Sequence, residues 1–276
     1  MAMLALCGVA VAQAPAVSGD VNGDGVCTVD DVAALYNYLL FDDSSALVNG
    51  DQDGDGFITV GDVTWVYNVL LYMSHDDGHE CVDLGLPSGT LWSTMNIGAS
   101  SPEDYGDYFA WGETTPKDVY DWSTYKWCEG SDSTLTKYCT ISNYGYNGFV
   151  DNKTELDPED DAATAAWGAE WRMPSLEQIQ ELIDNCTTEW TTRNGVNGRL
   201  FTSNINSASV FLPAAGVRWD SELNLAGSHG NYWSRTLYSG SPSHACYLNF
   251  YSGNVGASNV DRYYGQSVRA VRVSQN

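Results

Sequence analysis

The chain has 276 residues and a formal net charge of −24, with 36 acidic against 12 basic side chains. Such a charge repels nucleic acids and anionic membranes and attracts cations, so neither nucleic-acid binding nor binding to acidic lipids is expected. Hydrophobic residues make up 43% and aromatic residues 12% of the chain, which excludes a disordered protein and suits one large domain or two unequal ones.

The first seventeen residues read MAMLALCGVAVAQAPAV, an apolar run followed by small residues. This pattern predicts a secretory signal peptide and leader over residues 1–17. The segment lacks the basic residues that usually begin such a peptide, which leaves a truncated start open, and Cys7 leaves a lipid anchor open. The run is too short to span a bilayer, and no later segment is long enough. We therefore expect a secreted or cell-surface protein without a transmembrane segment.

Two acidic twelve-residue segments, DVNGDGVCTVDD (20–31) and DQDGDGFITVGD (51–62), repeat each other thirty-one residues apart. Each places oxygen ligands at positions 1, 3 and 5, a glycine at position 6, a backbone carbonyl at position 7 and a carboxylate at position 12, which is the pattern of a calcium loop. The sequence therefore predicts two Ca²⁺ sites. Their ligands are Asp20, Asn22, Asp24, Val26 and Asp31 in the first loop, and Asp51, Asp53, Asp55, Phe57 and Asp62 in the second.

An apolar pattern of helical period follows each loop, in residues 32–41 and 63–73, and none precedes it. This duplicated loop and helix resembles dockerin, the calcium-binding module of bacterial extracellular enzyme complexes, over residues 18–73. The resemblance implies a cohesin-like partner, contacted through Val29, Asp30, Tyr36, Asn37, Val60, Gly61, Tyr67 and Asn68. The family often has Ser-Thr where this chain has Val-Asp and Val-Gly, so the type of partner stays open. A purely structural role of the loops, or packing on the same chain, is the alternative.

A short polar segment, SHDDGHE (74–80), predicts a linker between two domains. His75 and His79 lie beside three acids there, so a metal site is the alternative to a solvated linker.

Two helices are predicted beyond the linker, among short strands and long loops. Residues 157–168 place Asp157 as an N-cap before Pro158, and the acids Asp157, Glu159, Asp160 and Asp161 are expected to form a solvated helix start. Residues 175–186 begin with a capping box formed by Ser175 and Gln178. Cys128 and Cys139 are the nearest pair of cysteines and the best candidates for a disulfide in an exported protein.

Five phrases of the second region, VDLGLPSGTLWSTMNIGAS, YGDYFAWGET, EWRMPSLEQIQEL, VFLPAAG and YGQSVRAVR, resemble the Fibrobacter succinogenes major-paralogous domain of Bacteroidetes surface proteins. That group is similar to the formylglycine-generating-enzyme branch of the C-type lectin fold. The resemblance covers nearly all of residues 81–273 and implies an α+β C-type-lectin-like domain over residues 81–276, in which Trp171 and Arg172 are structural. The whole chain is thus expected to be multidomain, a small all-α calcium-loop module followed by this α+β domain.

Catalysis is not expected. The formylglycine-generating enzymes use paired cysteines near the C-terminus, and here only Cys246 lies in that region. His229 and His244 are the only histidines after the linker, and no nucleophile-elbow pattern occurs. Paired carboxylates for glycoside cleavage remain open.

The C-terminal stretch, residues 232–273, alternates apolar frame residues with polar and aromatic insertions. Tyrosine offers contact area at small entropic cost, and Ser, Gly and Asn offer adaptable hydrogen bonds, so these insertions predict a binding surface for a protein or a glycan. The glycan would not be held through calcium, because neither Glu-Pro-Asn nor Gln-Pro-Asp occurs. Ordinary exposed loop residues are the alternative. The candidate ligand-binding residues are Arg235, Tyr238, Ser241, Ser243, His244, Tyr247, Tyr251, Ser258, Asn259, Asp261 and Tyr263.

These features together predict an exported, calcium-binding, non-catalytic recognition or adhesion protein. The dockerin-like module would tether or stiffen a lectin-like domain that binds its ligand through C-terminal loops. The alternative is a component of an extracellular polysaccharide-degrading assembly, recruited through the dockerin-like module. A purely structural surface-layer component is a third reading.

Overall fold

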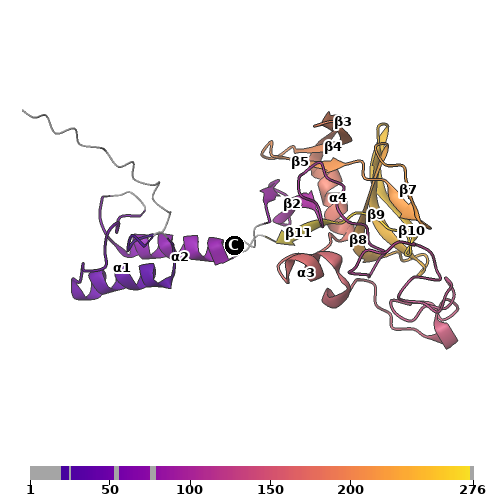
Figure 1. The fold of residues 1–276 in the computed structure, drawn as a ribbon, viewed down its shortest axis with the longest axis horizontal. Coiled ribbons are helices and arrows are strands. Elements are labelled where there is room, and N and C mark those ends of the chain that lie inside the picture. Colours follow the sequence, from indigo (N-terminus) through magenta and orange to yellow (C-terminus); the bar gives the residue numbers. More distant parts are fainter. Residues whose placement is uncertain (1–19, 25, 53–55, 75–78, 274–276) are drawn as a thin grey trace, which may run out of the picture. The chain divides into compact units, whose positions relative to one another are not determined.

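A computed structural model describes residues 20–24, 26–52, 56–74 and 79–273 of the chain (Figure 1). These residues form two compact units that divide between residues 78 and 79. The predicted signal peptide and leader, residues 1–17, lie outside the described residues. No helix in the described part is long and apolar enough to cross a bilayer.

The first unit contains two helices, α1 (Val29–Phe41) and α2 (Val60–Ser74), each of which directly follows one of the acidic loops, as the periodicity predicts. Residues 42–50, which precede the second loop, contain no helix, again as predicted. α1 begins where the Thr28 side chain accepts a hydrogen bond from the Asp30 N–H. The helix ends where Asp42 adopts a left-handed backbone with φ 56°.

A small apolar core holds the first unit together. It consists of Val21, Ala34, Leu35, Val63 and Val66, all buried. A core of this size supplies little stability by itself, and small modules of this kind gain stability from bound metal ions.

The second unit is rich in β-strands, arranged in antiparallel sheets. The first sheet has the order β1-β2-β11 and the second the order β3-β4-β5; the third has the order β10-β9-β8, and β6 pairs with β7. The strands are β1 (Cys81–Asp83), β2 (Thr90–Asn96), β3 (Cys186–Arg193), β4 (Val196–Ser203), β5 (Ser209–Pro213), β6 (Val217–Trp219), β7 (Glu222–Asn224), β8 (His229–Leu237), β9 (His244–Tyr251), β10 (Asn254–Asp261) and β11 (Arg269–Val273).

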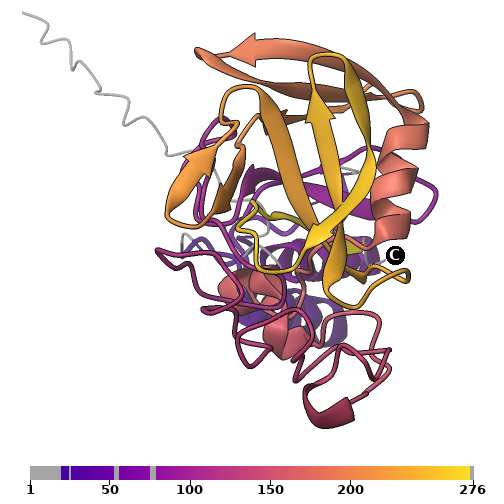
Figure 2. The same cartoon turned by 90° about the vertical axis from the view of Figure 1, so that its right-hand side faces the viewer.

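Two α-helices and two short 3₁₀ helices accompany these sheets: η1 (Tyr146–Gly148), η2 (Pro158–Asp160), α3 (Ala162–Trp167) and α4 (Leu176–Asn185). The predicted capping box of α4 is confirmed, with the Ser175 hydroxyl accepting from the Gln178 N–H and the Gln178 side chain accepting from the Ser175 N–H. α4 packs against β8, β9 and β10 (Figure 2). Its apolar face, including Ile179 and Leu182, is buried in a core cluster with Phe201 of β4 and Phe250 of β9.

The predicted start of the preceding helix is confirmed only for a 3₁₀ turn: η2 begins at Pro158 with Asp157 at its N-cap position, but the Asp157 side chain makes no capping hydrogen bond. The α-helix α3 begins later, at Ala162, with Asp161 as its N-cap. Asp160 and Asp161 are not solvated, because they are 2% and 0% exposed. The Asp161 carboxylate accepts hydrogen bonds from the N–H groups of Ala163 and Met173, so it ties the start of α3 to the residues before α4.

Aromatic side chains dominate the core of the second unit. One cluster gathers around Trp111, Trp171 and Trp233, and another around Trp92 and Phe250. Most of the apolar frame residues of the C-terminal stretch are buried in these clusters, whereas Val255 is only partly buried. The buried frame residues are Trp233, Leu237, Leu248, Phe250, Val268 and Val271.

The cysteines are free thiols in the described part of the chain. The predicted disulfide between Cys128 and Cys139 is therefore wrong. The Cys128 thiol donates to the Trp122 carbonyl at 3.1 Å, and the Cys139 thiol donates to the Ile141 carbonyl at 3.2 Å. Each thiol therefore donates to a backbone carbonyl near it in the chain and is not bonded to the other cysteine.

Candidate calcium loops and recognition surfaces

The first acidic loop is shaped by hydrogen bonds between its own carboxylates and backbone. Asp20 Oδ1 accepts from the N–H groups of Gly23 and Asp24 at 2.7 and 3.1 Å. Asp24 Oδ1 accepts from the Val26 N–H at 3.0 Å. Gly23 has a φ of 78°, a left-handed value that glycine adopts without strain. These hydrogen bonds curve the backbone between Asp20 and Val26, a segment that contains four of the predicted calcium ligands of this loop.

Asp31, the predicted closing ligand, joins the two ends of this loop. Its Oδ1 accepts from the N–H groups of Val21 and Asn22 at 2.8 and 3.0 Å, and its Oδ2 accepts from the Thr28 N–H at 2.7 Å. The side chain is fully buried and lies in the first turn of α1, where the helix dipole favours a negative charge. Loop closure and helix start therefore depend on one carboxylate.

The second loop repeats this arrangement. Asp62 Oδ1 accepts from the Gln52 N–H and its Oδ2 from the Thr59 N–H, each at 2.7 Å. Gln52 and Thr59 are the counterparts of Val21 and Thr28 in the first repeat. Asp62 is also fully buried, so the duplication extends from sequence to hydrogen bonding. The predicted ligands Asp53 and Asp55 lie outside the described residues.

The donor chemistry of these loops fits a hard cation. The side-chain ligands are carboxylate or amide oxygens, which calcium prefers. All twelve basic side chains of the chain occur from Lys117 onward, so the first unit contains no lysine or arginine to balance its buried aspartates. Among the described residues, no three carboxylate, histidine or cysteine side chains already converge as a metal site. The residues of each loop fit a calcium ion in their type and spacing. Asp31 and Asp62 each hold together the two ends of their own loop.

The positions implied to contact a cohesin are exposed. Val29 and Val60 expose 73% and 65% of their surface, and Tyr36 and Tyr67 expose 46% and 55%. Asp30, Asn37 and Gly61 are exposed as well, and the side chain of Asn68 lies outside the described part. Large apolar residues in equivalent positions of two helices therefore face outward.

Two further exposed residues extend the α1 surface and were not predicted. Leu40 and Phe41 expose 68% and 74% of their surface. They follow Tyr36 and Asn37 at a spacing of four residues, which places them on the same helix face. Leu40 and Phe41 could have been predicted from this four-residue spacing in the sequence. We call Val29, Tyr36, Leu40 and Phe41 the α1 face.

Six of the eleven candidate ligand-binding residues lie together at one end of the third sheet. His244 Nδ1 lies 2.9 Å from Asn259 Oδ1, and His244 Nε2 lies 3.2 Å from Asp261 Oδ1. The Tyr238 ring stacks near the His244 ring, with centroids 6.3 Å apart. The hydroxyls of Ser241 and Ser243 lie 2.9 Å apart in the turn before β9. Burial raises the pKa of Asp261, and the nearby His244 opposes that rise.

The other five candidates lie elsewhere, so the eleven residues do not form one surface. Tyr251 is at the opposite end of β9, where its ring lies 5.3 Å from that of His229. Tyr247 is half-buried against the core, and Ser258 is its cross-strand partner on β10. The remaining two have structural contacts. Tyr263 packs on Trp122 and Tyr264, and Arg235 donates to the Met173 carbonyl and Gln178 Oε1.

His79, predicted to lie in a solvated linker, stacks on Trp167 of the second unit with ring centroids 3.9 Å apart. This residue therefore belongs to the folded second unit. His75, the other residue of the alternative metal site, lies outside the described residues.

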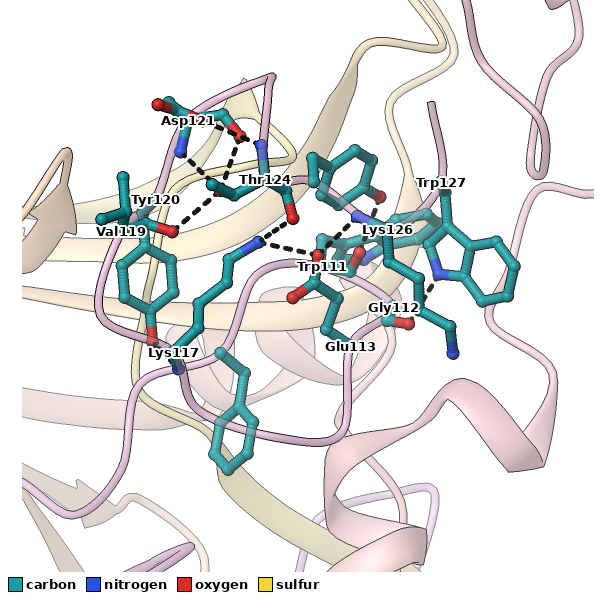
Figure 3. A network of polar contacts seen from close by, with 12 residues as sticks. Trp111, Gly112, Glu113, Lys117, Val119, Tyr120, Asp121, Thr124, Lys126 and Trp127 are labelled. Atoms are coloured by element: carbon teal, nitrogen blue, oxygen red, sulfur yellow. Dashed lines mark hydrogen bonds and ion pairs between the residues drawn. The ribbon is translucent and has the colours of Figure 1, made fainter. Parts of the chain in front are cut away.

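A lysine–carboxylate network, missed by the sequence analysis, orders the long irregular segment between β2 and α3 (Figure 3). Glu113 Oε1 accepts from Lys117 Nζ at 2.9 Å and from the Lys126 N–H at 2.8 Å. Lys117 Nζ also donates to the Thr124 carbonyl at 3.0 Å. The Trp127 indole donates to the Gly112 carbonyl at 2.7 Å. Because these groups bond to one another and to backbone, they support the loop rather than offer a reactive site.

Comparison with known proteins finds a family match within the first unit. A family model of the dockerin type I domain matches residues 18–75. This confirms the dockerin-like resemblance, and dockerin domains of this type bind calcium and cohesins and are typically extracellular. No curated protein and no solved structure matches the chain. The β-rich second unit therefore keeps its C-type-lectin-like assignment as a prediction.

Proposed function

We propose that this chain is a calcium-dependent docking protein, in which residues 18–75 bind two calcium ions and attach the β-rich unit to a cohesin-bearing extracellular assembly. The observation that carries this proposal is the outward-facing apolar surface that recurs at equivalent positions of α1 and α2. Val29 and Tyr36 are exposed on one helix, and Val60 and Tyr67 on the other. Exposed valines and tyrosines at repeated positions mark an interface.

Calcium would be held by the ligands that the loop pattern defines, with Asp31 and Asp62 as the closing carboxylates. When bound, the ion neutralises the clustered acids of each loop. The residues of the chain hold the two ends of each loop together. The buried aspartates already join residues 21 and 52 to the starts of α1 and α2. Orientation of the helices, and hence of their exposed faces, would then follow from loop closure.

The second unit is proposed to be the non-catalytic cargo, with a C-type-lectin-like fold. Burial raises the pKa of Cys246 to about 11, which supports an inert thiol and not an oxidising cysteine. Both ring nitrogens of His244 lie close to other side chains, Asn259 and Asp261, which supports a structural or recognition role for this histidine. Polysaccharide degradation would then be the work of other components of the assembly.

Recognition through the C-terminal loops is a second candidate role for the cargo. Its support is limited to the cluster of Tyr238, Ser241, Ser243, His244, Asn259 and Asp261, because the other predicted residues lie apart.

Calorimetric titration of a type I cohesin domain into the calcium-loaded full chain tests whether the exposed residues of α1 and α2 form the docking surface. The variant Tyr36→Ala with Tyr67→Ala should weaken binding at least about tenfold, because aromatic anchors dominate interface energies. Val48→Ala is the matched control, since Val48 is 74% exposed in the same unit but lies outside both helices, and it should leave the affinity within about twofold. Equal affinity of the tyrosine variant and the wild type would contradict the proposed face.

A further inference from the structure

A closed surface loop, residues 139–152, projects from the second unit, at the lower right of Figure 1 and at the bottom of Figure 2. Its two ends are tied together. The N–H groups of Asp151 and Asn152 both donate to the Cys139 carbonyl, at 3.0 and 3.2 Å. In return, the Asp151 carboxylate accepts from the N–H groups of Tyr138 and Cys139 at 2.7 and 2.9 Å.

The interior of this loop is held equally firmly. The Leu135 N–H donates to the Tyr144 carbonyl at 2.8 Å, and the Tyr146 N–H donates to the Leu135 carbonyl at 2.9 Å. Gly145 lies so close to Phe149 that a Cβ atom there would be 1.9 Å from the Phe149 carbonyl oxygen. The loop therefore has a defined shape before any partner binds, which lowers the entropic cost of binding.

Large apolar side chains are exposed on this loop. Tyr146 and Phe149 expose 46% and 36% of their surface, and Ile141 and Val150 expose 38% and 37%. All four fall within ten consecutive residues. Single exposed apolar residues are ordinary, but several of them on one short closed loop favour an interaction site.

The tip carries no charge, although the chain as a whole has a net charge of −24. Residues 140–150 contain no acidic or basic side chain, and Ser142, Asn143 and Asn147 expose hydroxyl and amide groups on the same loop. This mixture of Tyr, Ser, Asn and Gly is suited to adaptable hydrogen bonding around rigid aromatic contacts. An uncharged ligand fits such a tip, whereas an acidic one would be repelled by the surrounding carboxylates.

We propose that loop 139–152 is a binding site for a neutral polysaccharide. The rings of Tyr146 and Phe149 stack on the apolar faces of sugar rings, and the neighbouring amides bond to sugar hydroxyls. The site lies in the second unit and shares no residue with the cluster at His244. Because it uses no residue of the first unit, it does not depend on the proposed docking.

Depletion assays with the calcium-loaded full chain test this site. The probes are insoluble cellulose, xylan, mannan and starch, with polygalacturonate as the acidic comparison. At least one neutral polymer should retain the wild type, and Tyr146→Ala with Phe149→Ala should weaken that retention at least about tenfold. Tyr146→Phe keeps the ring and should retain most of the affinity. Ile205→Ala is the control, because Ile205 is an apolar side chain that is 54% exposed elsewhere in the same unit, and it should change retention less than about twofold.

Three results would overturn the proposal: no retention by any of the neutral polymers, preference for polygalacturonate, or unchanged retention of the double variant. Melting temperatures check that the variants fold. If the double variant melts more than about 5 °C lower, the single Tyr146→Ala carries the comparison, because Tyr146 is the more exposed ring. Titration of the same preparations with cohesin measures docking independently, so a loss of polysaccharide binding can be told apart from a loss of docking.

Discussion

At the scale of single residues, Asp31 and Asp62 carry most of the argument for calcium. Each is buried, begins a helix and accepts backbone N–H groups from both ends of its loop. Their importance could be predicted from the sequence, because the ligands of a calcium loop are local and their spacing is fixed by the turn itself. The unpredicted part is that both carboxylates already bind the loop ends through hydrogen bonds.

The variant Asp31→Asn should lower calcium affinity at the first loop by about tenfold or more, because it removes one full ligand charge while keeping the side-chain shape. Calcium titration of the apo chain by calorimetry measures the change. Asp30→Asn is the matched control, since Asp30 lies in the same first turn of α1 but is exposed and is not a predicted ligand. Equal losses in both variants would mean that total charge, and not the closing ligand, sets the affinity.

The candidate ligand-binding residues show what residue-level patterns leave out. Tyr and Ser content marked the C-terminal stretch as a recognition region, yet β9 separates His244 from Tyr251 by its whole length. Successive side chains on a strand also point to opposite faces, which separates His244 from Tyr247. Strand pairing joins residues far apart in the chain, so composition could not place these side chains on a common surface.

At the scale of elements, helices with local signals were predicted well. α4 has both its capping box and its apolar stripe within ten residues. The start of α3 was predicted too early because the Asp157 carboxylate pairs with lysines, one of them twenty residues before it in the chain. Lys137 Nζ lies 2.7 Å from Asp157 Oδ2, and Lys153 also pairs with that carboxylate, so the side chain makes no capping hydrogen bond to a helix N–H.

This ion cluster predicts a pH dependence of stability. Hydrogen bonds from Lys137, and then from Lys153, lower the pKa of Asp157 below its ordinary value. A carboxyl whose folded pKa is lowered stabilises the fold above its unfolded pKa of about 3.9, and that stabilisation is lost as the pH falls through the folded value. Asp157→Asn should therefore lower the Tm by about 2–4 °C at pH 7 and leave it nearly unchanged at about pH 2.

Thermal melts of the Asp157→Asn variant across pH 2–7 measure this effect. Glu159→Gln is the matched control, because Glu159 is 70% exposed and its carboxylate lies 3.7 Å from Lys137 Nζ. Its melting temperature should follow the wild type at every pH. A constant difference between Asp157→Asn and the wild type down to pH 2 would contradict the ion-pair explanation.

At the scale of the whole molecule, all the basic side chains lie in the second unit. The first unit has acids and no basic side chain, so a bound cation is what can balance it. In the second unit each of the four lysines pairs with a carboxylate. The first unit thus has no basic side chain to pair with its acids, whereas the second unit pairs its lysines internally, although its acidic residues outnumber its basic ones by 24 to 12.

The division into two units and the nature of the first could be predicted from the sequence, because the repeat and the calcium pattern are short and local. The exposed loop 139–152 could not, since its apolar residues would suit a buried strand equally well. The folded unit closes this loop through hydrogen bonds between residue 139 and residues 151 and 152, and its rings are exposed there. The exposure of these side chains depends on how the whole unit folds, so it could not be predicted from the sequence of the segment alone.

The most direct test of the central claim is a calorimetric titration of a type I cohesin domain into the wild-type full chain, once with saturating calcium and once with excess chelator. Calcium-dependent docking predicts saturable binding with calcium and at least about a hundredfold weaker binding with chelator, because the loops no longer fix the helices. Equal affinity in both conditions, or no binding with calcium, would contradict it.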